Sequence, residues 1–171
     1  MSTPDLLIRP AVSGDVPALT EIYNHYIRTS PATFDIEPVT VEARQEWASH
    51  YGTDGLYRLL VAERDGAVIG YATSSQFHER KAYQTSVQFS VYVHHQAHGH
   101  GVGSRLYTRL FEIMETMPVH RVYAGITLPN PGSLALHKKF GFEDIGTQDE
   151  VGHKFGRYWS VIWLEKRMSY A

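Results

Sequence analysis

A run of glycines between a strand-like segment and a helix-like segment constrains this chain more than any other feature. Thr85–Val93 carries apolar residues at every second position, as a strand does. Gly99, Gly101 and Gly103 follow, and a helical apolar stripe begins at Val102. Free amides at a helix N-terminus form an anion site, and glycines let a phosphate approach the backbone. The segment therefore predicts a phosphate-bearing ligand, and the alternative is a plain glycine-rich turn.

Two well-known phosphate motifs do not fit this segment. A dinucleotide fingerprint requires Gly-x-Gly-x-x-Gly, and Ser104 occupies the place of its third glycine. A nucleotide-binding P-loop requires Gly-Lys-Ser or Gly-Lys-Thr, which the segment lacks.

Length and composition exclude several other classes. A chain of 171 residues predicts one domain, residues 1–171, and a net charge of -2 gives no basic face for nucleic acid. Cysteine is absent, which rules out disulfides and a cysteine nucleophile and favours a cytoplasmic location. The apolar runs are too short to cross a membrane, and the first ten residues do not resemble a signal peptide.

The periodicity along the chain predicts a mixed α/β domain. The expected strands are Leu6–Arg9, Arg58–Glu63, Ala67–Ser74, Thr85–Val93, Arg121–Thr127, Ile145–Gln148 and Tyr158–Leu164. The expected helices are one capped by Ser13, one capped by Thr40, one with a stripe from Val102 to Met117, and Ser133–Phe140 closed by Gly141. Asp65-Gly66 predicts a hairpin turn, and Thr29–Pro38 predicts a loop.

Two motifs together resemble one superfamily. Gln96-x-x-Gly99-x-Gly101 is similar to the pyrophosphate-binding signature of the GNAT acetyltransferases. Asn130-x-x-Ser133-x-x-x-His137, which continues to Gly141-Phe142, agrees with it. Further segments resemble the branch that acetylates phosphinothricin and methionine sulfoximine: Ile22–Ile27, Thr33-Phe34, Glu37-Pro38, Arg80-x-Ala82-Tyr83, Ser90–Val93 and Val151–Arg157.

The resemblance implies a fold and a cosubstrate. It implies a central, mostly antiparallel mixed sheet flanked by helices and splayed between its fourth and fifth strands, with the pantetheine of acetyl-CoA lying in the splay. The residues that it assigns to acetyl-CoA are Val91, Tyr92, Val93, Gln96, Gly99, His100, Gly101, Val102, Gly103, Ser104, Asn130 and Ser133.

The catalytic residues include one departure from the branch. Relatives carry a glutamate base two residues before the Ser-Val-Tyr-Val run, and this chain has Gln88 there. Glutamine cannot take a proton at neutral pH. Three alternatives stay open: another base (Tyr83, or Glu79 or His78 through water), an acceptor amine that is already partly neutral, or a site that only binds acyl-CoA. Retained activity is favoured, because positioning and electrostatics usually outweigh one proton acceptor.

Other site residues come from the same resemblance. His137 stands where the family places the group that protonates the leaving thiolate, and an imidazole can donate near neutral pH. The acceptor site is expected to comprise Phe34, Phe77, Arg80, Tyr83 and Gln88, with the forked guanidinium of Arg80 holding the acceptor carboxylate. Lys154, Phe155 and Arg157 match the branch motif, and we expect them at a subunit contact or at the pocket rim.

The expected function is N-acetylation of a small, amino-acid-like amine by a homodimer. The rivals are a non-catalytic acyl-CoA binding or sensing domain, suggested by Gln88, and an enzyme that acetylates protein N-termini or lysines. No metal is expected: His94, His95, His98 and His100 crowd one loop, but no carboxylate or thiolate accompanies them at zinc-site spacing.

Overall fold

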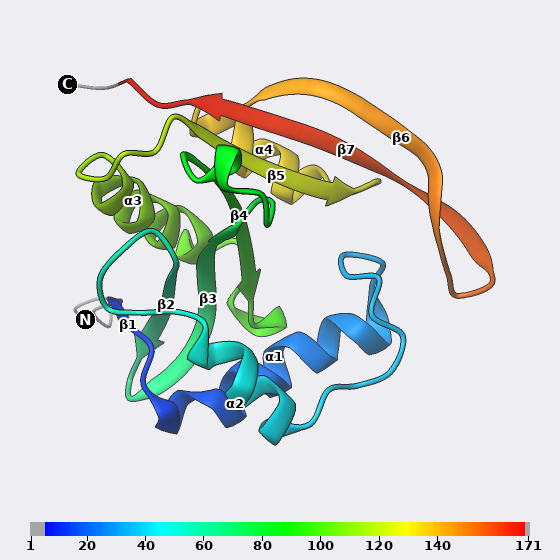
Figure 1. Cartoon of the computed structure of the whole chain (residues 1–171). Helices are drawn as coiled ribbons and strands as arrows, with labels where there is room; N and C mark the ends of the chain where they lie inside the picture. The colour runs from blue at the N-terminus through cyan, green and yellow to red at the C-terminus, as the bar shows by residue number, and fades with distance from the viewer. Residues whose placement is uncertain (1–5, 170–171) are drawn as a thin grey trace.

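The computed structural model describes residues 6–169, which form a sheet with helices on both faces (Figure 1). The sheet has seven strands in the order β1-β2-β3-β4-β5-β7-β6. The strands are β1 (Leu7–Pro10), β2 (Arg58–Arg64), β3 (Ala67–Gln76), β4 (Ser86–Val93), β5 (Arg121–Thr127), β6 (Glu143–Lys154) and β7 (Arg157–Arg167). Only β4 and β5 run parallel among these neighbours, which confirms the mostly antiparallel mixed sheet.

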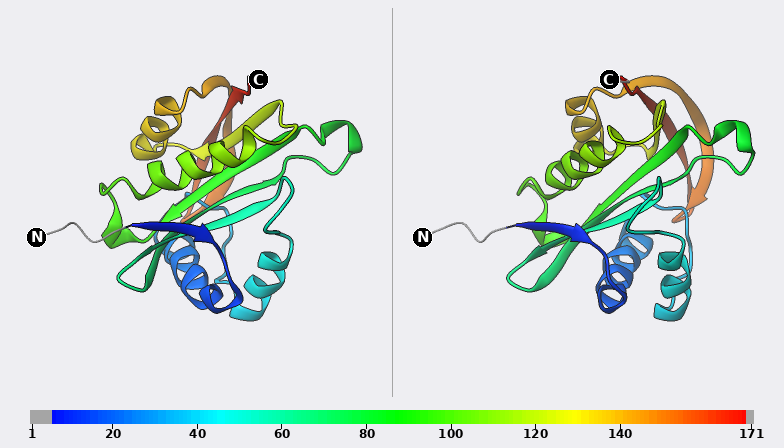
Figure 2. Two further views of the ribbon diagram at one scale, coloured as in Figure 1. Left: turned by 90° about the vertical axis from the view of Figure 1, so that its left-hand side faces the viewer. Right: turned by 60° about the vertical axis from the view of Figure 1, so that its left-hand side comes forward.

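The helices divide between the two faces of the sheet (Figure 2). One face carries α1 (Val16–Thr29) and α2 (Val41–Ser49), and the other carries α3 (Val102–Met114) and α4 (Pro131–Lys139). Three short 3₁₀ turns precede α1, β4 and α3: η1 (Ser13–Asp15), η2 (Lys81–Tyr83) and η3 (His95–Ala97).

The larger core lies between α3 and the sheet. Leu106, Tyr107 and Leu110 are fully buried there and pack with Phe89 of β4. This confirms the apolar stripe of α3, except at its end. Met117 lies beyond the last helical residue, so the predicted stripe was too long by one turn.

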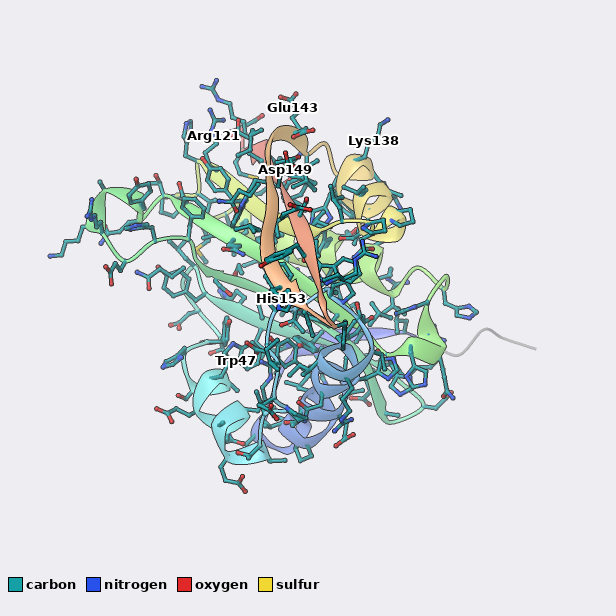
Figure 3. The ribbon with its side chains drawn as sticks, turned by 90° about the vertical axis from the view of Figure 1, so that its right-hand side faces the viewer. Trp47, Arg121, Lys138, Glu143, Asp149 and His153 are labelled. Carbon is teal, nitrogen blue, oxygen red and sulfur yellow. The ribbon has the colours of Figure 1, made fainter. Side chains whose placement is uncertain are left out.

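The second core, between α1, α2 and the sheet, contains a buried charge. The Arg44 guanidinium lies 3.4 Å from the ring centroid of Trp47 and 4.4 Å from that of Tyr23. Its Nη2 donates to the Tyr71 hydroxyl at 2.6 Å. Cation–π contacts of this kind stabilise a guanidinium that has left water. Trp47 marks this side of the molecule in Figure 3.

The predicted caps and turns had mixed outcomes. Thr40 caps α2 as predicted, because its hydroxyl accepts from the Ala43 amide at 3.2 Å. Asp65 and Gly66 both adopt positive φ, which confirms the hairpin turn. Ser13 is not an N-cap, because it begins η1. The Asp15 carboxylate instead accepts from the Val12 amide at 2.8 Å.

The last two strands are longer than predicted. The expected Ile145–Gln148 lies in the first half of a 12-residue strand, and β7 extends beyond the expected segment at both ends. Nearly all of β6 is exposed, so it lacks the alternation of buried and exposed residues that the prediction relied on. Its pairing with β7 also shifts register twice, which blurs the period further.

The splay between the middle strands is present. β4 and β5 pair only at Ser86–Arg121, Val87–Val122 and Gln88–Tyr123. From Phe89 onward, β4 keeps its β3 partners but has no partner on the β5 side. The remainder of β4 thus presents a free strand edge to the gap.

Candidate functional site

A cleft of about 590 Å³ occupies the gap where β4 and β5 diverge. Its walls come from the second half of both strands, the loop before α3, the first turns of α3 and the length of α4, with Tyr26 of α1 beside them. A free strand edge offers backbone donors and acceptors to an extended ligand. The cleft therefore suits a long, thin molecule with amide groups.

The glycine loop closes one end of this cleft. Gly99 and Gly101 adopt positive φ of 79° and 73°, a backbone conformation that favours glycine. Gly101 is the N-cap of α3 and has no side chain to satisfy the first helical amides. A β-carbon on Gly103 would lie 3.2 Å from Leu136, so a larger residue would narrow the cleft. The loop thus presents bare amides to an anion.

Most of the residues assigned to acetyl-CoA line this cleft. They are Val91, Tyr92, Val93, Gly99, Gly101, Val102, Gly103, Ser104, Asn130 and Ser133. Gln96 and His100 are not among the lining residues: Gln96 lies in η3, and both side chains are exposed. The Asn130 side chain also caps α4, since its Oδ1 accepts from the Ser133 amide at 3.1 Å.

Lys139 adds a positive charge that the sequence motifs did not identify. It lines the cleft, and its Nζ donates to the Ser104 hydroxyl at 3.2 Å. The ammonium therefore lies beside the first turn of α3, where it reinforces the attraction of the helix terminus for an anion. A basic residue in the last turn of α4 was the available signal, but only the fold brings it next to α3.

His137 lies in the cleft wall with both ring nitrogens engaged. Its Nδ1 donates to the Ser133 carbonyl at 2.7 Å, and its Nε2 lies 2.9 Å from the Tyr107 hydroxyl. In the neutral ring, Nε2 accepts a hydrogen bond from the Tyr107 hydroxyl. Burial lowers the pKa of His137, although the Ser133 carbonyl raises it in part. The ring is therefore a neutral acceptor toward Tyr107 at neutral pH.

Tyr26 of α1 joins the cleft to the opposite face of the sheet. Its hydroxyl donates to the Val93 carbonyl at 2.6 Å and lies 2.8 Å from His98 Nε2. Burial raises the pKa of Tyr26, so the hydroxyl stays protonated. This contact fixes the end of β4 directly before the glycine loop.

The face of the sheet opposite α3 carries Gln88, an expected acceptor residue, and Tyr92, which also lines the cleft. Tyr92 contacts Tyr23, Tyr26 and Tyr71 there. Gln88 projects to the same face as Tyr92, because the side chains of a strand alternate. Gln88 is not among the residues that line the cleft.

An aromatic cluster lies beside Gln88. Phe77 stacks on Tyr123, with centroids 4.2 Å apart, and Tyr83 contacts Phe77 and His78. The half-exposed Tyr83 and the exposed Arg80 belong to the same loop, which lies outside the cleft. Sequence reasoning missed Tyr123, although alternation along β5 was the signal that could have identified it.

Phe34 is held separately, by the tip of the β6–β7 hairpin. Its ring lies directly against Gly152, where no β-carbon would fit. Lys154 of the same tip is buried, and its Nζ donates to the Ser30 carbonyl at 2.9 Å and the Thr33 carbonyl at 2.8 Å. Burial lowers the pKa of Lys154. Lys154 thus ties the hairpin to the loop after α1 within one chain.

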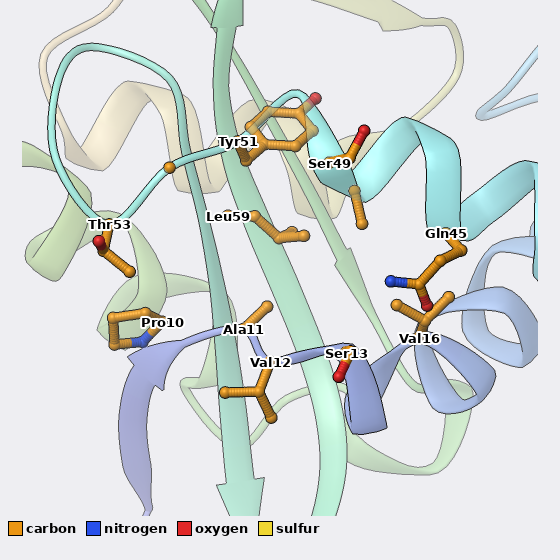
Figure 4. Close-up of a pocket in the computed structure, with 12 residues that line it drawn as sticks. Pro10, Ala11, Val12, Ser13, Val16, Gln45, Ser49, Tyr51, Thr53 and Leu59 are labelled. Carbon is orange, nitrogen blue, oxygen red and sulfur yellow. The ribbon is translucent and has the colours of Figure 1, made fainter.

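Two further features lie outside this arrangement. A small cavity of about 120 Å³ lies between the turn after β1 and α2, far too small for a cofactor (Figure 4). His25 stacks on His95 with centroids 4.3 Å apart. No group of three or more His, Cys, Asp or Glu side chains in residues 6–169 is arranged to hold a metal ion.

No helix in the described part of the chain has the length and apolar character needed to cross a membrane.

Comparisons with known proteins agree with this geometry. A model of the Acetyltransferase (GNAT) family matches residues 19–142. A phosphinothricin N-acetyltransferase from Streptomyces coelicolor is 48% identical and covers 96% of this chain and 97% of the relative. An L-methionine sulfoximine/L-methionine sulfone acetyltransferase from Pseudomonas aeruginosa is 31% identical and covers 92% of each protein.

A solved structure adds a ligand to the comparison. The GNAT superfamily phosphinothricin acetyltransferase from Sinorhizobium meliloti, in complex with acetyl-CoA, matches with a TM-score of 0.91 and 32% identity. The match covers 96% of this chain and 89% of that one.

Proposed function

The chain belongs to the GNAT acetyltransferase family, and on that premise we propose that it acetylates the primary amine of a small amino acid of the phosphinothricin or methionine sulfoximine type. It is an acetyl-CoA-dependent N-acetyltransferase, and its resemblance to this branch is confirmed by 48% identity over nearly the whole chain. The main support for the acceptor class is the extent of this match. It covers 96% of this chain and therefore includes the segments of the acceptor side as well as the cleft.

The cleft supports the proposed placement of acetyl-CoA. The free edge of β4 from Phe89 onward suits the amides of pantetheine, and the bare amides between Gly99 and Ser104 suit the diphosphate. Lys139 supplies the nearby positive charge. The thioester would then lie near the point where β4 and β5 separate, just beyond Gln88.

The reaction needs no covalent enzyme intermediate. The amine nitrogen attacks the thioester carbonyl, the C–N bond forms, the C–S bond breaks, and the sulfur of coenzyme A takes a proton. His137 and Tyr107 lie in the wall of this cleft. Because the neutral His137 ring accepts from the Tyr107 hydroxyl, we assign His137 to position that hydroxyl on the sulfur side of the cleft, and not to donate a proton itself. Gln88 and Tyr83 lie on the acceptor side, where Gln88 orients the amine by hydrogen bonding.

The acceptor side supports recognition of a small amino acid. Phe77 and Tyr83 form an aromatic wall, Phe34 forms another at the hairpin, and Arg80 is free to meet a carboxylate. Lys154 holds the loop that carries Phe34. The proposed partners are therefore acetyl-CoA and one small amine. We also propose that the protein uses no metal, consists of one domain and is cytoplasmic.

A homodimer is part of the proposal. The outer strand β6 has a free edge, and Ile145, Val151, Phe155 and Tyr158 are at least half-exposed on the β6–β7 hairpin. Exposed apolar side chains on an edge strand are typical of surfaces that pair with another chain. Light scattering of the purified protein is expected to give twice the chain mass of 19.4 kDa.

The rival is a domain that binds acyl-CoA without catalysis, and Gln88 is the observation that favours it. A coenzyme A release assay separates the two, with phosphinothricin, methionine sulfoximine, the common amino acids, polyamines and a peptide as acceptors. We expect release only with small amino-acid acceptors, fastest with phosphinothricin or methionine sulfoximine. Binding of acetyl-CoA without release for any acceptor would establish the rival, and peptide acetylation alone would assign the chain to protein substrates.

A further inference from the structure

One row of residues crosses four neighbouring strands on the face of the sheet that carries Gln88. Gln88 of β4 pairs with Tyr123 of β5, Tyr123 pairs with Glu165 of β7, and Glu165 pairs with Glu143 of β6. Residues directly opposite each other on adjacent strands project to the same face. A carboxylate therefore lies two strands from Gln88 on the same face, with one phenol between them.

Tyr123 and Glu165 stand directly opposite each other on β5 and β7. The Glu165 carboxylate interacts with the Tyr123 hydroxyl, and Phe77 stacks on the Tyr123 ring at an interplanar angle of 20°. Burial raises the pKa of Tyr123, and the Glu165 charge raises it further. The phenol thus stays protonated, so its oxygen can accept one proton while its own proton passes on. The Glu165 side chain is 28% exposed, which gives the proton a way out to solvent.

The charges around Glu165 balance one another. Arg121 of β5 lies with its Nε 3.8 Å from Glu165 Oε2, and Glu143 of β6 stands opposite Glu165. Arg121 and Glu143 lie at the same end of the molecule in Figure 3. Like charges directly opposite are destabilising, and the Arg121 cation offsets that repulsion. Two more groups act on Tyr123: Arg121 lowers its pKa, and Tyr83, in the loop before β4, raises it.

We infer that Tyr123 and Glu165 together accept the proton of the acceptor amine, in place of a carboxylate at position 88. The inference rests on the proposed function. The ammonium gives one proton to the Tyr123 oxygen, directly or through one water, while the Tyr123 proton moves to Glu165 and then to solvent. The freed nitrogen lone pair attacks the thioester carbon. After the C–S bond breaks, the second nitrogen proton ends on the sulfur of coenzyme A.

Distance explains why the phenol is needed. Adjacent strands lie about 4.8 Å apart, so two steps across the sheet separate the backbones of Gln88 and Glu165 by roughly 10 Å. A carboxylate at that distance cannot hydrogen-bond an amine beside Gln88, because such bonds span about 2.6–3.2 Å. Tyr123 is then the group that meets the substrate proton, and Glu165 acts through it.

The test compares the wild type with Glu165→Gln, Tyr123→Phe, a Gln88→Glu/Glu165→Gln double variant and the control Glu143→Gln. Tyr123→Phe keeps the ring that stacks on Phe77, so it interrupts the route without changing a charge. Glu143→Gln removes a carboxylate from the same row but not from the route. Steady-state rates are measured between pH 6 and pH 9 with phosphinothricin, and melting temperatures check folding.

The expected result has three parts. Glu165→Gln and Tyr123→Phe each lower kcat about 100-fold at pH 7, the low end for loss of a general base, and leave KM for acetyl-CoA within about twofold. The deficit shrinks as pH approaches the pKa of the free amine. The double variant regains at least about tenfold, because position 88 then carries its own carboxylate, and Glu143→Gln matches the wild type.

Two results would overturn the inference while the proposed function stands. One is a folded Glu165→Gln protein as fast as an active wild type at every pH. The other is a loss that is independent of pH and not restored by Gln88→Glu, which would make the role of Glu165 structural. A wild type that transfers acetyl to no acceptor would overturn the proposed function, and this inference with it.

Discussion

The cleft that we propose for acetyl-CoA and the proposed acceptor side of the same sheet are assembled in different ways. The cleft is built mainly from two short segments, residues 89–104 and 124–139, and from backbone amides. The acceptor side gathers side chains from the loop after α1, the loop before β4, the strand β5 and the β6–β7 hairpin. The first region depends on local backbone geometry, and the second depends on how distant strands pair.

This difference fits the substrate that we propose for each region. A cosubstrate common to a whole family can be held by backbone atoms, which every sequence supplies. An acceptor that varies among relatives must be distinguished by side chains. Changes in the cleft should therefore affect acetyl-CoA, and changes on the acceptor side should affect the amine.

The largest effect is expected from Gly103→Val, which tests the cleft. The new side chain would meet Leu136 and Val91 and narrow the space for pantetheine. We expect kcat/KM for acetyl-CoA to fall about 100-fold, as for a reactant displaced by about 1 Å. Calorimetry with acetyl-CoA and initial rates measure this. Gly14→Val is the control, because nothing lies within 4 Å of its β-carbon position, and an equal loss in both variants would contradict the argument.

Lys154→Met tests the acceptor side. The variant leaves the carbonyls of Ser30 and Thr33 without their charged donor, so the free energy of unfolding should fall by about 2–3 kcal/mol. The acceptor KM should rise while KM for acetyl-CoA stays constant. Urea titrations and separate KM values report these effects. The exposed Lys138→Met serves as control (Figure 3), and a rise in both KM values would show that the two regions are not separable.

His137→Asn tests the pH dependence of the cleft wall. Burial lowers the pKa of His137 in the folded chain. Below about pH 6.5, His137 therefore binds a proton more readily in the unfolded chain than in the folded one. Wild-type stability should thus fall as pH drops, with at most about 1.4 kcal/mol per pH unit from this one proton. The variant should show a shallower slope between pH 7 and pH 5. His153→Asn, which changes an exposed ring, should keep the wild-type slope.

The smallest effect is expected from Tyr26→Phe, at the contact between the two regions. The hydroxyl that fixes the Val93 carbonyl is lost, at a cost of about 1 kcal/mol. KM for acetyl-CoA should rise about fivefold although Tyr26 belongs to α1. Initial-rate measurements at varied acetyl-CoA check this. Tyr57→Phe is the control, since the Tyr57 hydroxyl makes no hydrogen bond within residues 6–169, and an unchanged KM in Tyr26→Phe would remove the proposed bridge.

The cleft could be predicted from the sequence because its signals are local. The alternation before Val93 and the glycines after it determine a strand, a loop and a helix start in one continuous segment. The splay, confirmed here, came from family resemblance and not from periodicity. Lys139 and Tyr107 escaped prediction because they reach the cleft only when α3 and α4 pack together.

The acceptor side could be predicted only in part. Gln88 was placed on the correct strand, but its neighbours across the sheet depend on the parallel pairing of β4 and β5. That pairing is short and leaves no period in the sequence. Glu165 lies on β7, which pairs with β6, and only one third of β6 was predicted. The sequence therefore could not show that Gln88 and Glu165 lie in one row across the sheet.

The link between Lys154 and the carbonyls of Ser30 and Thr33 has a consequence for recombination among relatives. It joins positions more than 120 residues apart, and it holds Phe34 against Gly152. A chimera that takes the C-terminal hairpin from one parent and the N-terminal loop from another separates these contacts. Acceptor preference should therefore transfer only when both segments are exchanged as a pair.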